Sequence, residues 1–320
     1  MMPDYAASFS DVRAAAERLR AWVHRTPIAT CATLDRLAGR QLFFKCEHLQ
    51  KIGAFKFRGA MNAMLQLPEE AAARGVVTHS SGNHAQALAL AARLRGVEAT
   101  IVMPANSAAV KRRAVVDYGA RVVDCAPNLA ARESTTSEIQ SQTGATLVPP
   151  YDHPHIIAGQ GTAALELLEQ VPDLDAVIAP VGGGGLMAGT CIAIRGLAPQ
   201  VNLFAGEPLG ADDAARSFAG KEFVPQTDPR TIADGLRTSL GELTWPILRD
   251  HLAGVITATE EEIIAAMRLA WERAKLMIEP SSAVPIAAVL GEQFRQWPEL
   301  RRVGIILSGG NVDLAQLPFK

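Results

Sequence analysis

A lysine between two phenylalanines is the residue with the clearest chemical potential in this 320-residue chain. Lys56 lies between Phe55 and Phe57 in the stretch KIGAFKFRGA. Apolar neighbours that remove water from an amine lower its pKa, and a neutral amine is a nucleophile that can bond covalently to a carbonyl compound. The alternative from the local sequence is a surface lysine whose apolar stem covers its neighbours.

A run of four glycines is the second feature. Gly182, Gly183, Gly184 and Gly185 follow an apolar stretch and precede one of helical composition. Backbone N–H groups without side chains, next to a helix N-terminus, favour a bound phosphate. The run is neither a P-loop, since no Gly-Lys-Ser/Thr follows it, nor a GxGxxG dinucleotide motif. A bound dinucleotide remains one alternative, because Glu207 follows the next strand-like segment, where an acidic residue could bind a ribose. A plain flexible turn is the other alternative.

Two polar loops also follow strand-like segments. Residues 80–84 are SSGNH and residues 308–311 are SGGN. The sequence contains no metalloprotease or nucleophile-elbow motif. A desolvated lysine together with a phosphate-binding loop is the combination that a cofactor such as pyridoxal phosphate requires, so these loops favour that chemistry.

An alternating pattern of strands and helices has to position these loops. Short β-branched runs predict strands at 41–47, 75–80, 99–104, 120–125, 145–150, 176–181, 201–208, 254–259 and 302–309, and helical patterns occur at 10–23, 83–95, 108–118, 129–142, 156–170, 185–196, 260–276 and 282–291. Such alternation predicts an α/β fold with mostly parallel, twisted sheets covered by helices, in which ligands collect at the carboxyl ends of strands. We expect two lobes, a large domain of residues 1–74 plus 153–320 and a small domain of residues 75–152.

The composition argues against several classes of protein. The net charge is −2 and the pI is about 6.4, without basic runs, so we expect no nucleic-acid or membrane-surface partner. Residues 176–194 are uncharged and nearly long enough to span a bilayer, but a proline and four glycines interrupt them. We expect no secretory signal, because the N-terminus lacks a positively charged segment followed by an apolar core.

The four cysteines predict neither a zinc site nor a disulfide framework. Cys31, Cys46, Cys125 and Cys191 are scattered, with no CxxC pair. A reducing, cytoplasmic location is therefore the expectation.

Seven motifs together resemble one enzyme family. They are KIGAFKFRGA (51–60), SSGNHAQALA (80–89), AGQGT (158–162), APVGGGGLMAG (179–189), IADG (232–235), EPSSAVPIA (279–287) and LSGGNVDL (307–314). In this order they are similar to those of the fold-type II pyridoxal-phosphate enzymes, which have a tryptophan-synthase-β-like fold. More narrowly, they resemble the threonine dehydratase, serine racemase and threo-3-hydroxyaspartate dehydratase branch. The resemblance runs from about residue 20 to the C-terminus and implies a homodimer that acts on a small amino acid.

The resemblance implies cofactor contacts in four segments. Lys56 would bind the cofactor covalently and move the Cα proton of the substrate, with Phe55 close to the cofactor. Asn83 would hydrogen-bond its 3-hydroxyl, Gly182–Gly185 would bind its phosphate, and Ser308 would face its pyridine nitrogen. A serine cannot stabilise a protonated ring by charge, so the ring is a weaker electron sink, which favours β-elimination over a long-lived carbanion. The alternative for Ser308 is a simple turn serine.

The resemblance also implies that the substrate binds at the SSGNH loop. Ser80, Gly82 and His84 would hold its carboxylate with backbone donors. Ser81 would protonate the face opposite Lys56, which makes some racemisation chemically possible. The alternative for Ser81 is a helix N-cap without a catalytic role.

Two more positions bear on the choice of substrate. Arg132 would approach the substrate and pair with a second carboxylate, as in 3-hydroxyaspartate, although a solvated helix arginine is the alternative. Tyr151 stands where racemases of this branch tend to have asparagine and dehydratases an aromatic residue, which argues against a dedicated racemase.

A divalent cation site is implied by the stretch EPLGADD (207–213). In the racemase-like branch its counterparts bind a cation through what would be Glu207, the carbonyl of Ala211 and Asp213. Oxygen ligands of this kind suit Mg²⁺, and also Ca²⁺ or Mn²⁺. The alternative is an acidic cluster that interacts favourably with a helix N-terminus.

The resemblance therefore implies a pyridoxal-phosphate-dependent ammonia-lyase that dehydrates and deaminates L-threonine, L-serine or threo-3-hydroxyaspartate. A serine or aspartate-type racemase on the same site is the first alternative. A module that binds a phosphate metabolite without covalent chemistry is the second. Because the chain ends soon after the SGGN loop, we do not expect the C-terminal regulatory domain of the isoleucine-pathway dehydratases.

Overall fold

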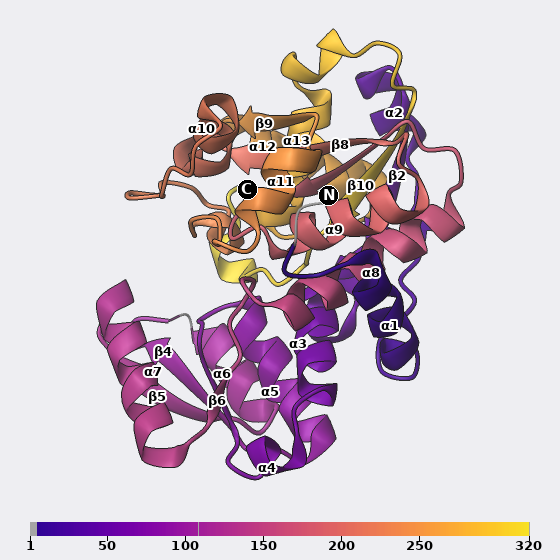
Figure 1. Ribbon diagram of the computed structural model, residues 1–320. Coiled ribbons are helices and arrows are strands. Elements are labelled where there is room, and N and C mark those ends of the chain that lie inside the picture. Colours follow the sequence, from indigo (N-terminus) through magenta and orange to yellow (C-terminus); the bar gives the residue numbers. More distant parts are fainter. Residues whose placement is uncertain (1–4, 108, 320) are drawn as a thin grey trace.

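The computed structural model describes residues 5–107 and 109–319, which form two lobes (Figure 1). The larger lobe contains a six-stranded sheet in the order β1-β2-β10-β7-β8-β9. Neighbouring strands are parallel except β1, which is antiparallel to β2. The strands are β1 (Ile28–Ala29), β2 (Gln41–Cys46), β7 (Ala176–Pro180), β8 (Asn202–Pro208), β9 (Gly254–Ala258) and β10 (Arg302–Leu307).

Both faces of this sheet are covered by helices. One layer consists of α1 (Phe9–Leu19), α8 (Pro154–Gln170), α9 (Gly185–Leu197) and α11 (Trp245–His251), and the other of α2 (Ala32–Ala38), α12 (Glu260–Leu269) and α13 (Pro280–Leu290). Along β7, Val177 and Ala179 pack in the first layer, while Ala176 and Ile178 pack in the second. A strand buried on both faces is apolar throughout, which explains why this segment carries no charge.

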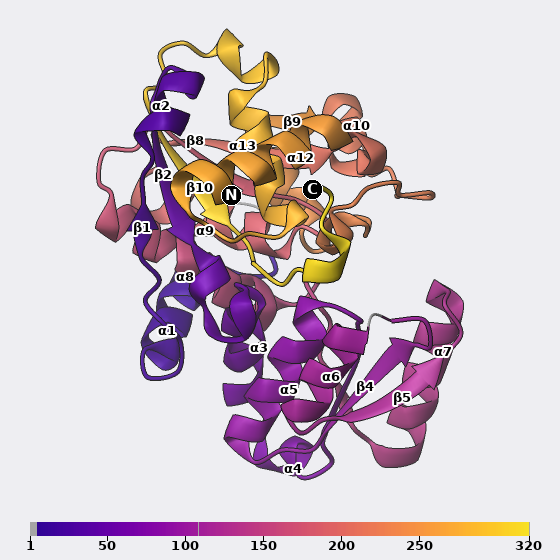
Figure 2. The ribbon, with the colours of Figure 1, turned by 180° about the vertical axis from the view of Figure 1, so that it is seen from behind.

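The smaller lobe, which lies below the larger one in Figure 2, contains a parallel sheet. Its strand order is β5-β4-β3-β6. Its strands are β3 (Val76–His79), β4 (Ala99–Pro104), β5 (Arg121–Cys125) and β6 (Thr146–Leu147). Helices α3 (Lys56–Leu65), α5 (Asn83–Arg95) and α6 (Ala109–Asp117) share the core on one face, and α7 (Leu129–Thr143) covers the other. The short α4 (Glu69–Ala72) leads into β3.

The predicted α/β fold with two mainly parallel sheets is confirmed, but β1, α2, α4, α10 (Asp213–Gly220) and α11 are not among the predicted elements. Three further differences concern longer segments. Helix α3, which begins at Lys56, is not among the predicted helices. The predicted strand 145–150 is paired only at Thr146–Leu147, because the two prolines that follow have no N–H to donate. Helix α12 ends at Leu269 and continues as a π-helical turn, Ala270–Ala274, rather than as α-helix to residue 276.

The uncharged stretch 176–194 is divided between β7, the glycine loop and α9. In the part of the chain that the structure describes, no helix is long and apolar enough to cross a membrane. All four cysteines are free thiols in the structure.

Candidate active site

The loops that follow β2 and β10 are hydrogen-bonded to each other. The two strands are neighbours in the large sheet, so their carboxyl ends deliver these loops to the same edge. The Phe55 N–H donates to the Ser308 carbonyl at 2.9 Å, and the Gly310 N–H donates to the Gly53 carbonyl at 2.9 Å. These bonds hold the segment before Lys56 against the SGGN loop.

Lys56 begins helix α3 with its amine turned toward the segment that follows β6. Nζ donates to the Pro150 carbonyl at 2.6 Å and lies 5.2 Å from the Phe55 ring and 6.0 Å from the Tyr151 ring. Burial lowers the pKa of this amine to about 8, and the Glu279 carboxylate opposes the shift. Near neutral pH the amine is therefore neutral far more often than an ordinary lysine, as a nucleophile or base requires.

The four-glycine loop connects β7 to the 13-residue helix α9. A Cβ on Gly183 would lie 2.3 Å from the Tyr151 ring, and Gly184 has a φ of +86°, which favours glycine. The Thr244 hydroxyl donates to the Gly183 carbonyl at 2.8 Å, which helps to fix the loop. Within the described residues, the N–H groups of the loop donate to no protein acceptor. Free donors at a helix N-terminus favour a bound phosphate.

Asn83 is fixed between a carboxylate and an amide. Its Nδ2 donates to the two Glu279 oxygens at 2.9 and 3.1 Å, and its Oδ1 accepts from Asn311 Nδ2 at 2.9 Å. Because one neighbour accepts and the other donates, the orientation of the Asn83 amide is determined. The two oxygens of one carboxylate can share a single N–H, and the other N–H of Nδ2 can then donate to a ligand.

Glu279 itself is buried, and burial together with the nearby Asp234 raises its pKa to about 7. It also accepts the Asn311 N–H at 3.1 Å. The residue pattern predicts no role for Glu279 or Asn311. Their only signal in the sequence is that both belong to motifs that carry the family resemblance.

Ser308 is buried and paired with a second hydroxyl. Its Oγ lies 3.1 Å from Ser282 Oγ, and Ser282 in turn bonds to the carbonyl and the N–H of Gly309, both at 2.7 Å. This position therefore offers a neutral hydroxyl to a bound ring. Ser282 is a further residue that the residue pattern does not single out.

Ser81 lies between β3 and α5 and does not cap the helix. The N-cap of α5 is Gly82, and no side chain caps it. The Ser80 hydroxyl accepts the Gly82 N–H at 3.3 Å, and a Cβ on Gly82 would have no atom within 4 Å. The N-cap interpretation of Ser81 is therefore wrong, and its loop borders open space.

The His84 side chain is engaged elsewhere. Its Nε2 lies 2.9 Å from the Val148 carbonyl. Burial, together with the charge of Lys56, lowers the pKa of His84 to about 3, so the ring is neutral and Nε2–H donates. A substrate carboxylate would therefore meet the backbone N–H of His84 rather than its ring.

Arg132 of α7 has a buried guanidinium nitrogen. Its Nε has no hydrogen-bond partner among the described residues. After burial itself, the Arg132 charge is the next largest factor that lowers the pKa of His79 at the end of β3. The same charge opposes the burial that raises the pKa of the Tyr151 hydroxyl. A half-buried arginine with one buried, unpartnered N–H favours an anion at this position.

Glu207 and Asp213 form a separate pair of buried carboxylates beyond β8. Glu207 accepts two N–H groups from the first turn of α10 (Asp213–Gly220) at 2.9 and 2.8 Å. Asp213 Oδ2 accepts the Leu240 N–H at 3.0 Å, whereas Oδ1 is buried without a partner. Burial and the neighbouring Asp213 raise the pKa of Glu207 to about 9, and burial raises that of Asp213 to about 6. This pair needs either protons or a cation.

Residues 5–107 and 109–319 contain no cluster of three or more His, Cys, Asp or Glu side chains that could hold a metal ion. A cation at Glu207 and Asp213 would therefore need backbone or water oxygens as well. The Ala211 carbonyl belongs to the short turn between them, Leu209–Ala211, in which Ala211 is the buried residue.

Comparison with known proteins agrees with this arrangement. The chain matches the family described as pyridoxal-phosphate dependent enzyme over residues 19–309. It is 50% identical to a serine racemase of Dictyostelium discoideum, covering 99% of this chain and 98% of the relative. It is 47% identical to a β-hydroxyaspartate dehydratase of Paracoccus denitrificans, covering 98% and 99%.

A crystal structure of a pyridoxal 5′-phosphate-dependent aspartate racemase is similar over its full length. It aligns with a TM-score of 0.95 at 40% identity and covers 100% of both chains. The family match spans most of this chain and the relatives span nearly all of it. The chain therefore belongs to the pyridoxal-phosphate-dependent enzymes, in the fold-type II branch that includes serine racemase, threonine deaminase and hydroxyaspartate dehydratase.

Proposed function

We propose that this chain is an amino-acid racemase that also catalyses β-elimination, with serine as its first substrate. The observation that carries the proposal is that Ser81 follows β3 without capping α5, so its hydroxyl is available for chemistry. Racemisation needs a proton-transferring group on each face of Cα, and Lys56 would be the other one. The serine racemase relative supports the same choice.

The residues at the site fit pyridoxal phosphate, which when bound supplies an electron-withdrawing ring that makes the Cα–H bond acidic. The glycine loop has free N–H donors for the phosphate, and Asn83 keeps one N–H for the 3-hydroxyl. Lys56 would take the Cα proton, and Ser81 would exchange one on the opposite face. The neutral Ser308 favours loss of the β-hydroxyl as a competing reaction.

Ser81→Ala is expected to separate the two activities. D-serine formation from L-serine should fall by about 100-fold or more, because the second proton-transferring group is gone. Pyruvate formation should persist, because elimination needs only Lys56 on one face. Chiral chromatography and a pyruvate assay on the same sample measure both products.

Ser80→Ala is the matched control for this experiment. It removes a neighbouring hydroxyl from the same loop and should change both products by the same factor. Unchanged D-serine formation in Ser81→Ala, or a parent enzyme that forms pyruvate alone, would overturn the proposal.

Capture of added pyridoxal phosphate by the cofactor-free protein should speed up with pH and level off above about pH 8. Only the neutral Lys56 amine attacks a carbonyl, and burial lowers its pKa to about 8. The growth of visible absorbance after mixing, followed at several pH values, gives the rate. A rate that still rises steeply near pH 10, as for an ordinary lysine, would contradict the assignment.

Dehydration of threo-3-hydroxyaspartate is the second candidate function, and Arg132 favours it. A buried guanidinium nitrogen without a partner suits the second carboxylate of a dicarboxylic substrate. Both the dehydratase of Paracoccus denitrificans and the aspartate racemase are relatives whose names specify such substrates.

Arg132→Gln tests this candidate through a ratio of rates. The kcat/KM for 3-hydroxyaspartate should fall at least about 10-fold relative to that for serine, since only the dicarboxylate loses a charged partner. Arg113→Gln on α6, which covers the other face of the small sheet, serves as the control. An equal loss of kcat/KM for both substrates would exclude a role for Arg132 in binding the second carboxylate.

We also propose that Glu207, Asp213 and the Ala211 carbonyl bind Mg²⁺ or Ca²⁺. Adding either cation to the EDTA-treated protein should raise its melting temperature by roughly 5 °C at saturating concentration. The shift should be larger near pH 8 than near pH 6, because the cation must displace protons from carboxyls whose pKa values are raised to about 9 and about 6. Glu207→Gln should abolish the shift, and no shift at either pH in the parent protein would contradict the site.

A further inference from the structure

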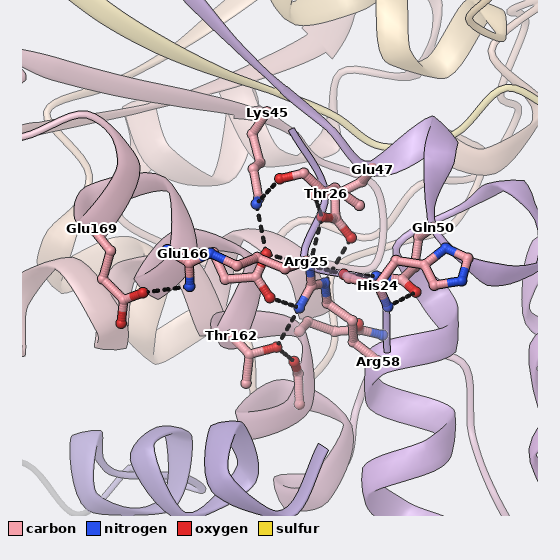
Figure 3. Close-up of polar contacts among 12 residues, drawn as sticks. His24, Arg25, Thr26, Lys45, Glu47, Gln50, Arg58, Thr162, Glu166 and Glu169 are labelled. Carbon is pink, nitrogen blue, oxygen red and sulfur yellow. Dashed lines mark hydrogen bonds and ion pairs between the residues drawn. The ribbon is translucent and has the colours of Figure 1, made fainter. Parts of the chain in front are cut away.

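Four charged side chains form a buried network next to helix α3 (Figure 3). Lys45, Glu47 and Arg58 have fully buried side chains, and the side chain of Glu166 is 14% exposed. Two cations and two anions give the network no net charge. Burial alone would raise the pKa of Glu47, but Arg58 and Lys45 hold it below its ordinary value, so the network is ionised.

Arg58 is the centre of this network and uses both edges of its guanidinium. Nε and Nη2 donate to the two oxygens of Glu47 at 2.7 and 2.8 Å. Nη1 and Nη2 donate to the two oxygens of Glu166 at 2.7 and 2.9 Å. The Thr162 hydroxyl and the His24 carbonyl are further acceptors, at 3.2 and 3.4 Å. Two bidentate pairs fix the position of the guanidinium plane, which a lysine ammonium could not reproduce.

These bonds connect three elements at the point where Lys56 is attached. Glu47 directly follows β2, Glu166 lies on α8, and Arg58 lies in the first turn of α3, two residues after Lys56. That helix start has no side-chain cap of its own. A Cβ on Gly59 would lie 2.4 Å from the Gln160 side chain of α8, so α3 and α8 are also in close contact here.

Stability alone is a poor reason for four buried charges. Removing charges from water is costly, and well-packed apolar residues are often as stable or more stable in their place. No member of the network is hydrogen-bonded to Asn83, Ser308 or the glycine loop in the described part of the chain. The network is better explained by a role in holding the neighbouring first turn of α3, which carries Lys56.

We propose that Arg58 is a positioning residue that holds the first turn of α3 so that the Lys56 amine stays at the Pro150 carbonyl, in place to bind the cofactor. This inference rests on the cofactor chemistry assigned to Lys56. In this role Arg58 contacts neither cofactor nor substrate. It acts by fixing the backbone from which Lys56 extends, with Glu47 as its principal partner and the Lys45–Glu166 pair as support.

Two charge-balanced double variants test the inference. Arg58→Met/Glu47→Gln removes the Arg58–Glu47 pair next to Lys56 and keeps the Lys45–Glu166 pair. Lys45→Met/Glu166→Gln removes the supporting pair and keeps the Arg58–Glu47 pair. Each removes two of the three ion pairs of the network, and the Arg58–Glu166 pair is lost in both. The net charge stays unchanged, so losses of general stability are matched and are checked by thermal melting. The variants therefore differ in whether the Arg58–Glu47 pair or the Lys45–Glu166 pair is lost.

The primary measurement is the pH profile of pyridoxal-phosphate capture without substrate. In Arg58→Met/Glu47→Gln the midpoint should move up by about one pH unit, because a displaced amine regains water. The affinity for the cofactor should fall at least about 10-fold. In Lys45→Met/Glu166→Gln the midpoint should stay in place and the affinity should change by about threefold at most. Equal changes in both variants, in proportion to their melting temperatures, would overturn the inference.

Arg58→Lys decides the question if the first double variant does not fold. It keeps the charge and nearly the size of the side chain but cannot form the bidentate pair with Glu47. It should show the same upward shift of the midpoint, and a profile identical to the parent protein would also overturn the inference. Because these readouts need no turnover, they are independent of whether the parent enzyme forms D-serine, which tests the proposed function.

Discussion

Lys56→Ala is expected to remove the visible absorbance of lysine-bound cofactor and to reduce both racemisation and elimination by at least about 1000-fold. The reason is that one amine serves two purposes, as the covalent attachment of the cofactor and as the group that takes the Cα proton. Its contact with Pro150 and its pKa of about 8 mark it as the amine prepared for this chemistry. An absorbance spectrum and the two product assays measure the effect.

Lys51→Ala is the matched control. Lys51 lies five residues earlier in the same loop, and its Nζ is 5.5 Å from the Phe57 ring, outside the hydrogen bonds that define the site. Its removal should leave spectrum and rates as they are. If Lys56→Ala kept the absorbance band and the activities, the covalent role would be lost, and a module that binds a phosphate metabolite without covalent chemistry would have to be reconsidered.

Gly183→Ala is expected to lower the affinity for pyridoxal phosphate by about 10- to 100-fold. A Cβ there would lie 2.3 Å from the Tyr151 ring, so either the ring or the loop must move, at a cost of about 1–3 kcal/mol for such crowding. Because the free N–H donors of the loop are what would bind the phosphate, their displacement should weaken cofactor binding. Lys56 is intact in this variant, so the visible band should return at high cofactor concentration.

Gly220→Ala provides the comparison for the same substitution without crowding. Gly220 ends α10, and a Cβ there would have no atom within 4 Å. Its cofactor affinity should equal that of the parent protein. An unchanged affinity in Gly183→Ala, measured by absorbance titration, would mean that the loop does not hold the phosphate.

Much of the fold follows from the chemistry of short segments. Residues 176–181 are apolar on both sides because β7 is covered by helices on both faces, and this continuous pattern predicts a buried parallel strand. Helix α3 could not be predicted in the same way, because its buried face includes Arg58 and Asn62. These two polar residues can be buried only because residues of other elements bind them. A search for a periodic pattern of apolar residues cannot detect such partners.

The assembly of the site depends on the order of strands in space. Lys56 and Ser308 are brought together because β2 pairs with β10, and sequence alone does not determine which parallel strands are neighbours. Glu279 is similar: its role becomes visible only when Asn83 of the small lobe lies within hydrogen-bond distance. The glycine loop and Lys56 could be singled out from sequence because each has an unusual local composition.

The balance between elimination and racemisation is where the sequence-based expectation changes. The aromatic residue Tyr151 favours a dehydratase only if its ring contacts the substrate. In the structure, a Cβ on Gly183 would collide with the Tyr151 ring, so an aromatic residue at this position is explained by packing on the glycine loop. That weakens the argument against racemisation, and the serine racemase relative favours it.

Incubation of the enzyme with L-serine in D₂O tests the central claim most directly. If Lys56 and Ser81 exchange protons on the two faces of Cα, D-serine should accumulate with deuterium at Cα, alongside pyruvate. Chiral separation followed by mass spectrometry measures the label in each enantiomer. Recovered serine that is entirely the L-enantiomer, with pyruvate as the sole product, would contradict racemisation at this site.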